Sequence, residues 1–135
     1  MMSEKLETSR LPLSPHLQIW RWQLPMTLSL LHRISGIGLA FGVFMLLWML
    51  MSLAAGEVAY ARFYNFSATP LGLFMIFCWS AGLFYHICNG VRHLSWDCGY
   101  LLELKNAYRS GYAAMGVGIF LLVMTWFIAC PWGHS

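Results

Sequence analysis

Charged residues are scarce in this chain of 135 residues, and three long stretches have none. Asp, Glu, Lys and Arg make up 10% of the sequence, whereas soluble domains contain about 25%. No such residue lies between Arg33 and Glu57, between Arg62 and Arg92, or after Arg109. Each gap can hold a helix that spans a hydrocarbon core about 30 Å thick, which takes roughly 20 residues. The sequence therefore predicts an all-α membrane protein with three transmembrane helices, over about residues 25–54, 70–94 and 112–130.

The sequence has no closely spaced cysteine pair, and we do not expect its first apolar segment to be a cleavable leader. The cysteines form no C-x-x-C pair, which gives little support to a disulfide or a cysteine-bound cluster; they are Cys78, Cys88, Cys98 and Cys130. The first apolar segment is longer than the roughly 7–15 residue apolar region of a signal peptide. Glu4 and Glu7 argue against a mitochondrial presequence, which is poor in acids. We expect a multi-pass protein of the bacterial inner (cytoplasmic) membrane.

Basic residues are unevenly distributed around the three spans. One group precedes or opens the first span or lies between the second and third: Lys5, Arg10, Arg21, Arg33, Arg92, Lys105 and Arg109. Only Arg62 lies between the first and second spans. The positive-inside rule therefore predicts a cytoplasmic N-terminus and a periplasmic C-terminus. Because the basic residues serve as topology determinants, they do not indicate a nucleic-acid surface.

The N-terminal 24 residues differ in composition from the rest of the chain. This segment contains prolines and the run Trp20, Arg21, Trp22, and tryptophan beside arginine is typical of the headgroup zone. We expect residues 1–24 to form an interfacial arm on the cytoplasmic surface of the lipid bilayer. Residues 25–135 then form the three-helix transmembrane domain.

His86 is an ionisable residue inside the second span, six residues before Arg92, and such a residue marks a candidate functional site. The spacing puts His86, Gly90 and His93 on one helix face, and Gly90 leaves a gap that a flat macrocycle could enter. A haem iron takes an axial imidazole in a low-dielectric pocket. The alternative is a hydrogen-bonded structural histidine. A bis-histidine haem would need its second ligand from a partner chain.

The start of the first span lies at the same membrane level as the end of the second, because the two helices are antiparallel. Ser29 and Arg33 are four residues apart and share a helix face. A hydroxyl and a guanidinium there could hold a quinone carbonyl, and the arginine would stabilise the negative charge that reduction adds. The alternative is that Ser29 bonds back to its own helix and Arg33 extends to lipid phosphate.

Small residues cluster in all three spans, at residues 35–38, 80–82 and 116–118. Such residues let helices approach closely in lipid. They serve either packing within this chain or contact with a partner subunit.

Three segments carry a family resemblance: S-P-H-L-Q-I-W from Ser14, L-S-L-L-H-R-I-S-G from Leu28, and Y-H-I-C-N-G-V-R-H-L-S-W-D from Tyr85. Together they resemble the cytochrome b subunit of succinate dehydrogenase, the larger membrane anchor of respiratory complex II. The resemblance covers the arm, the three spans and the order of the motifs. An extra Leu11 and Trp20 in place of the family's tyrosine are departures within the arm.

The resemblance implies a role for each motif residue. His86 is implied as an axial ligand of haem b, whose second ligand comes from a second, smaller anchor subunit. Ser29 and Arg33 are implied to line the pocket of ubiquinone, which is the substrate. Propionate or subunit contacts are implied for His32, Arg92 and His93.

The resemblance also implies that this chain is one subunit of an enzyme. A flavoprotein subunit would oxidise succinate and an iron–sulfur subunit would pass the electrons on. This chain has no flavin motif and no covalent catalytic residue, so it would anchor these subunits and share the haem and quinone pockets. Two alternatives are a haem-free anchor of a related dehydrogenase or fumarate reductase, and a small transporter subunit. A transporter would need polar residues along all three spans, which the third does not offer.

Overall fold

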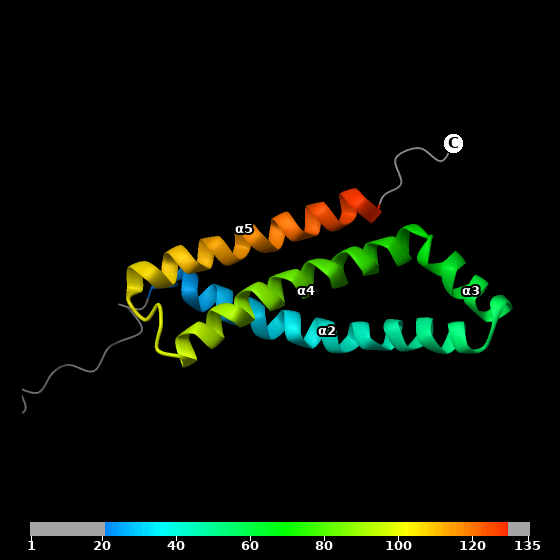
Figure 1. Ribbon diagram of the computed structural model, residues 1–135, viewed down its shortest axis with the longest axis horizontal. Helices are drawn as coiled ribbons and strands as arrows, with labels where there is room; N and C mark the ends of the chain where they lie inside the picture. Colours follow the sequence, from blue (N-terminus) through cyan, green and yellow to red (C-terminus); the bar gives the residue numbers. More distant parts are fainter. Residues whose placement is uncertain (1–20, 130–135) are drawn as a thin grey trace, which may run out of the picture.

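The computed structural model describes residues 21–129, which form four helices and contain no strand. The helices are α2 (Leu24–Ala54), α3 (Glu57–Ser67), α4 (Pro70–Asp97) and α5 (Leu104–Ala129). Helix α4 runs through the middle of the molecule and packs against the other three (Figure 1). Helices α2, α4 and α5 are long and apolar enough to cross a membrane. The predicted class, an all-α membrane protein with three spans, is confirmed.

The ends of the long helices follow from local sequence. Pro25 and Pro70 each occupy a first helical turn, where the missing N–H costs no hydrogen bond. Thr69 caps α4, and its side-chain oxygen accepts a hydrogen bond of 3.1 Å from the Gly72 backbone N–H. After α4 the chain turns at Gly99, whose φ of 82° lies in the left-handed region that glycine adopts freely.

Two helices extend further than the charge pattern indicates. Helix α5 begins at Leu104 rather than near Tyr112, and α4 continues to Asp97 rather than ending near Leu94. The extra turns contain charged residues such as Lys105 and Arg109. Charge marks where a helix leaves the hydrocarbon, and the helix itself continues beyond that boundary.

Helix α3 was not anticipated from the sequence. It occupies most of the connection between the first two spans and joins α2 to α4 at one end of the molecule (Figure 1). Phe63 is its buried residue, and the Phe63 ring meets Trp48 of α2 edge-on at 5.3 Å. A helix this short depends on such tertiary contacts, which the sequence does not display.

Much of the predicted N-terminal arm falls on residues 1–20, which lie outside the described part of the chain. Of its last residues, Trp22 is 58% exposed, and its indole N–H donates a hydrogen bond to the Thr27 hydroxyl at the start of α2. Cys130, the predicted end of the third span, is likewise outside the described residues.

The bundle buries polar as well as apolar residues, and its surface is apolar. Among residues 21–129, the buried side chains include Leu28, Asn89 and Arg92, at 1%, 1% and 3% exposure. Large apolar side chains such as Phe41, Phe44 and Ile128 are 68–75% exposed. This is the reverse of a soluble core, and it fits a chain whose surroundings are lipid or partner helices.

The small residues pack against a neighbouring helix at one position and face open space at three others. A Cβ atom at Gly118 would lie 3.7 Å from the backbone of Phe84, so α4 and α5 pack closely there. In contrast, a Cβ atom at Gly38, Gly82 or Gly116 would meet no atom of the described chain within 4 Å. Those three positions leave open space for lipid or a partner.

Candidate functional site

Three histidines gather where α2 crosses α4. The His32 and His86 rings stack with centroids 3.9 Å apart and an interplanar angle of 11°. The His93 ring lies 5.1 Å from the His32 ring. The predicted juxtaposition of the start of the first span with the end of the second is therefore present. Within residues 21–129, however, no three His, Cys, Asp or Glu side chains are arranged to hold a metal ion by themselves.

The hydrogen bonds of His86 assign its tautomer. Its Nδ1 lies 3.2 Å from the backbone oxygen of His32 and 3.0 Å from Ser35 Oγ. A carbonyl oxygen can only accept, so Nδ1 must carry the hydrogen. Nε2 then has a free lone pair, and no group within residues 21–129 hydrogen-bonds to it. The His32 ring covers one face of the His86 ring. Nε2 is not among the buried, unpaired atoms of residues 21–129, so it is available to a ligand.

Two further ring nitrogens in this cluster are buried and lack a hydrogen-bond partner within the described chain. They are His32 Nδ1 and Trp96 Nε1. The Trp96 ring meets the His93 ring edge-on at 5.1 Å. Leaving a buried polar atom unpaired costs about 1–3 kcal/mol. Both nitrogens are enclosed by the described chain itself, so a group from outside would reach them only if their neighbours moved.

Glycines allow the histidines to approach the helices. A Cβ atom at Gly36 would lie 3.1 Å from His86 Cε1, closer than ordinary packing allows. At Gly90 the corresponding neighbour is His32 Cε1, at 3.7 Å. The space beside Gly90, predicted to admit a macrocycle, is thus occupied by the His32 imidazole.

Arg92 is buried and joins α4 to α5. Its Nε donates to Ser110 Oγ at 3.1 Å and its Nη2 to the Ala107 backbone oxygen at 2.9 Å. Its Nη1 donates to Asn89 Oδ1 at 3.3 Å. The guanidinium also lies 4.0 Å from the Trp96 ring centroid, within cation–π range. These contacts favour a structural role, and a contact between Arg92 and a propionate stays a prediction.

Two hydrogen bonds that join α2 to α4 were not predicted from the sequence. The Tyr85 hydroxyl donates to the Leu28 backbone oxygen at 2.6 Å, and the Asn89 amide donates to the same oxygen at 3.4 Å. The available signal was their polarity, because a polar side chain within a span must find a partner. The identity of that partner depends on how the helices cross.

Ser29 and Arg33 are not engaged by the described chain. Arg33 is exposed and Ser29 half-buried, and neither side chain forms a hydrogen bond or ion pair within residues 21–129. In particular, Ser29 forms no hydrogen bond to the backbone of its own helix. The alternative interpretation, in which Ser29 bonds to its helix and Arg33 extends to lipid phosphate, therefore lacks its first contact. Both groups are free to bind a molecule from outside.

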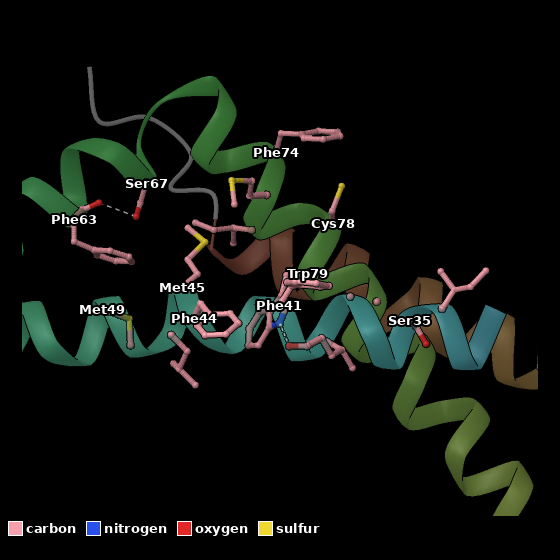
Figure 2. Close-up of a pocket in the computed structure, with 18 residues that line it drawn as sticks. Ser35, Phe41, Phe44, Met45, Met49, Phe63, Ser67, Phe74, Cys78 and Trp79 are labelled. Atoms are coloured by element: carbon pink, nitrogen blue, oxygen red, sulfur yellow. Dashed lines mark hydrogen bonds between the residues drawn. The ribbon is translucent and has the colours of Figure 1, made fainter. Parts of the chain in front are cut away.

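An apolar cavity of about 730 Å³ lies between α2, α3 and α4, on the side of the histidines nearer to α3. Figure 2 shows Phe41, Phe44 and Met45 on α2 facing Trp79 on α4. The Trp79 ring fills the space left by Gly42, and its N–H lies 3.5 Å from the Leu39 backbone oxygen. Sequence analysis did not predict this cavity.

Known proteins resemble this chain over most of its length. The profile of the family described as "Succinate dehydrogenase/Fumarate reductase transmembrane subunit" matches residues 7–125. The succinate dehydrogenase cytochrome b556 subunit of Rickettsia felis is 38% identical over 115 residues, covering 85% of this chain and 90% of the relative.

Two other relatives give the same result. The succinate dehydrogenase cytochrome b560 subunit of Reclinomonas americana is 36% identical over 126 residues, covering 87% of this chain and 85% of the relative. The cytochrome b556 subunit of Paracoccus denitrificans is 34% identical over 114 residues, covering 84% and 88%. Because the family profile spans most of the sequence and the relatives are matched over most of their own length, this chain belongs to the family of succinate dehydrogenase/fumarate reductase transmembrane subunits.

Proposed function

We propose that this chain is a membrane anchor and electron-transfer subunit of a succinate:quinone oxidoreductase, which shares a haem b and contributes to the site of ubiquinone reduction. The observation that carries the proposal is His86, whose Nδ1 is engaged by α2 while Nε2 is free. Relatives that are named cytochrome b subunits support the presence of a haem b.

The residues of the crossing fit a haem. His86 Nε2 would coordinate the iron, and the second axial ligand would come from a smaller anchor subunit. His32 and the nearby His93, whose rings lie 5.1 Å apart beside His86, would contact the propionates or the neighbouring subunit. When bound, the haem supplies a site that accepts and returns one electron. The protein's part is to orient His86 and to exclude water from the crossing.

Ser29 and Arg33 would bind the ubiquinone headgroup, whose tail remains in lipid. The Ser29 hydroxyl donates to a quinone carbonyl, and the Arg33 guanidinium stabilises the negative charge that develops on the oxygens. Reduction to the quinol takes two electrons and two protons. Both side chains are free of bonds within the described residues, which supports this assignment.

The remaining chemistry belongs to partner subunits. A flavoprotein subunit oxidises succinate, and an iron–sulfur subunit carries the electrons to the cytoplasmic side of this chain. In this proposal the arm and the connection between α4 and α5 dock those subunits at the inner membrane of a bacterium. Since the matched family includes fumarate reductase anchors, the second candidate is a haem-free anchor of such an enzyme.

The test is a reduced-minus-oxidised optical spectrum of the purified complex, with succinate as the reductant. We expect a low-spin b-type spectrum that is lost in His86→Ala, because the iron would lose an axial ligand. His134→Ala, a histidine outside the arm and the three predicted spans, is the matched control and should keep the spectrum. A haem signal that survives in His86→Ala would refute the ligand assignment, and absence of haem from the wild type would leave the anchor role alone.

A further inference from the structure

We propose that Ser35 is a positioning residue for His86, and that its hydroxyl oxygen accepts the Nδ1 hydrogen and thereby sets the orientation and donor strength of the imidazole. This inference rests on the proposed haem ligation by His86. Ser35 itself would touch neither the haem nor the quinone. It lies on α2, three residues after His32, and would act entirely through the His86 ring.

The hydrogen-bond directions at Ser35 are determined by its partners. Ser35 Oγ donates its one hydrogen to the His32 backbone oxygen at 2.8 Å. Its lone pairs are therefore the only groups it can present to His86 Nδ1, at 3.0 Å. Nδ1–H is thus shared between the Ser35 hydroxyl and the His32 carbonyl, which lies 3.2 Å away. In a span without water these two acceptors have no solvent substitute.

Neighbouring groups restrict the same ring from other directions. The His32 ring covers one face at 3.9 Å, and the Gly36 backbone approaches the Cε1 edge so closely that a Cβ atom would lie 3.1 Å away. Ser35 holds the Nδ1 edge. The imidazole plane is consequently fixed by one short segment of α2, residues 32–36, before any haem arrives.

The chemical consequence concerns the haem potential. A hydrogen bond from Nδ1–H to an acceptor increases the electron density of a metal-bound imidazole and fixes its ring orientation. A stronger donor favours ferric over ferrous iron, so it lowers the reduction potential. Ser35→Ala removes one of the two acceptors. The His32 carbonyl remains, so the tautomer and the haem should be retained.

The experiment is a redox titration of the haem in the purified complex, combined with electron paramagnetic resonance of its low-spin ferric signal. Ser35→Ala should shift the midpoint potential upward and move the signal, because the orientation of the ring changes. Ser35→Thr keeps a hydroxyl that can bond the carbonyl three residues earlier, and should resemble the wild type. Ser95→Ala is the matched control, since the Ser95 hydroxyl bonds only to its own helix at Val91.

Gly36→Ala tests the placement of the same ring from the adjoining Cε1 edge and should also move the resonance signal. A wild-type potential and signal in Ser35→Ala would overturn the proposal. If Ser35→Ala prevents assembly, an unchanged signal in Gly36→Ala would overturn it instead. Failure of the underlying haem assignment is distinguishable, because it appears as haem retained in His86→Ala whatever residue stands at position 35.

Discussion

Arg92 illustrates how polar residues hold this chain together at the scale of single side chains. Its guanidinium is 3% exposed and donates to Asn89, Ala107 and Ser110. An arginine in a span is costly unless it is paired or bonded to backbone carbonyls. Here the three acceptors meet that requirement, and the result is a polar contact between α4 and α5 that lipid cannot replace.

In contrast to Arg92, Arg33 is exposed and forms no hydrogen bond or ion pair within residues 21–129. Arg33→Leu should slow succinate-driven ubiquinone reduction by about 10²-fold, because removing one preorganised donor to a developing anion has an effect of that order. Reduction of a soluble dye by succinate should be unchanged. Arg62→Leu, on α3, is the control. Unchanged ubiquinone reduction in Arg33→Leu would contradict the assignment, and equal loss of dye reduction would indicate a docking role.

A candidate site residue could be predicted when its residue type alone stands out in an apolar span, and not when its role depends on a contact between two helices. His86, Ser29 and Arg33 were predicted as site residues because an ionisable or polar group in an apolar span is conspicuous by itself, and their roles stay predictions. Ser35 was noted only as a small residue, since serine in a span ordinarily bonds its own helix. Its second contact, to a ring 51 residues away, depends on the crossing of two helices and has no local signal.

At the scale of elements, the number of spans and most of their ends were predictable, but the end of α4 and the start of α5 were not. Absence of charge is a direct physical requirement of the hydrocarbon, so the three gaps correspond to α2, α4 and α5. The ends of α4 and α5 lie in polar segments where helix formation continues without a change in hydropathy. Helix α3 was missed because its stability comes from aromatic contacts such as that between Phe63 and Trp48.

The contact between α4 and α5 yields a prediction about Gly118. A Cβ atom there would meet the Phe84 backbone at 3.7 Å, which accommodates a methyl group but not a longer side chain. Gly118→Ala should be tolerated, whereas Gly118→Leu should destabilise the complex by about 1–3 kcal/mol through overpacking. Thermal denaturation of the purified complex measures this. Gly116→Leu, where the described chain leaves open space, is the control, and wild-type stability of Gly118→Leu would contradict the contact.

For the whole molecule, the distribution of basic residues predicts the orientation in the membrane. A reporter that is active only in the periplasm should be active when fused after Ser135, and inactive when inserted between α4 and α5 near Leu102. This follows from the single basic residue, Arg62, in the connection between the first two spans. The reverse pattern of reporter activity would contradict this orientation, and with it the proposal that the partner subunits dock on the cytoplasmic side.

The contacts between α2 and α4 are concentrated toward one end of the pair. Near the start of α2, the Leu28 carbonyl accepts from Tyr85 and Asn89; toward α3 the same helices diverge around the cavity of about 730 Å³ (Figures 1 and 2). Helices α2 and α4 are therefore joined most closely beside the histidines, and the proposed haem ligand His86 lies at this end of the pair and not beside the cavity.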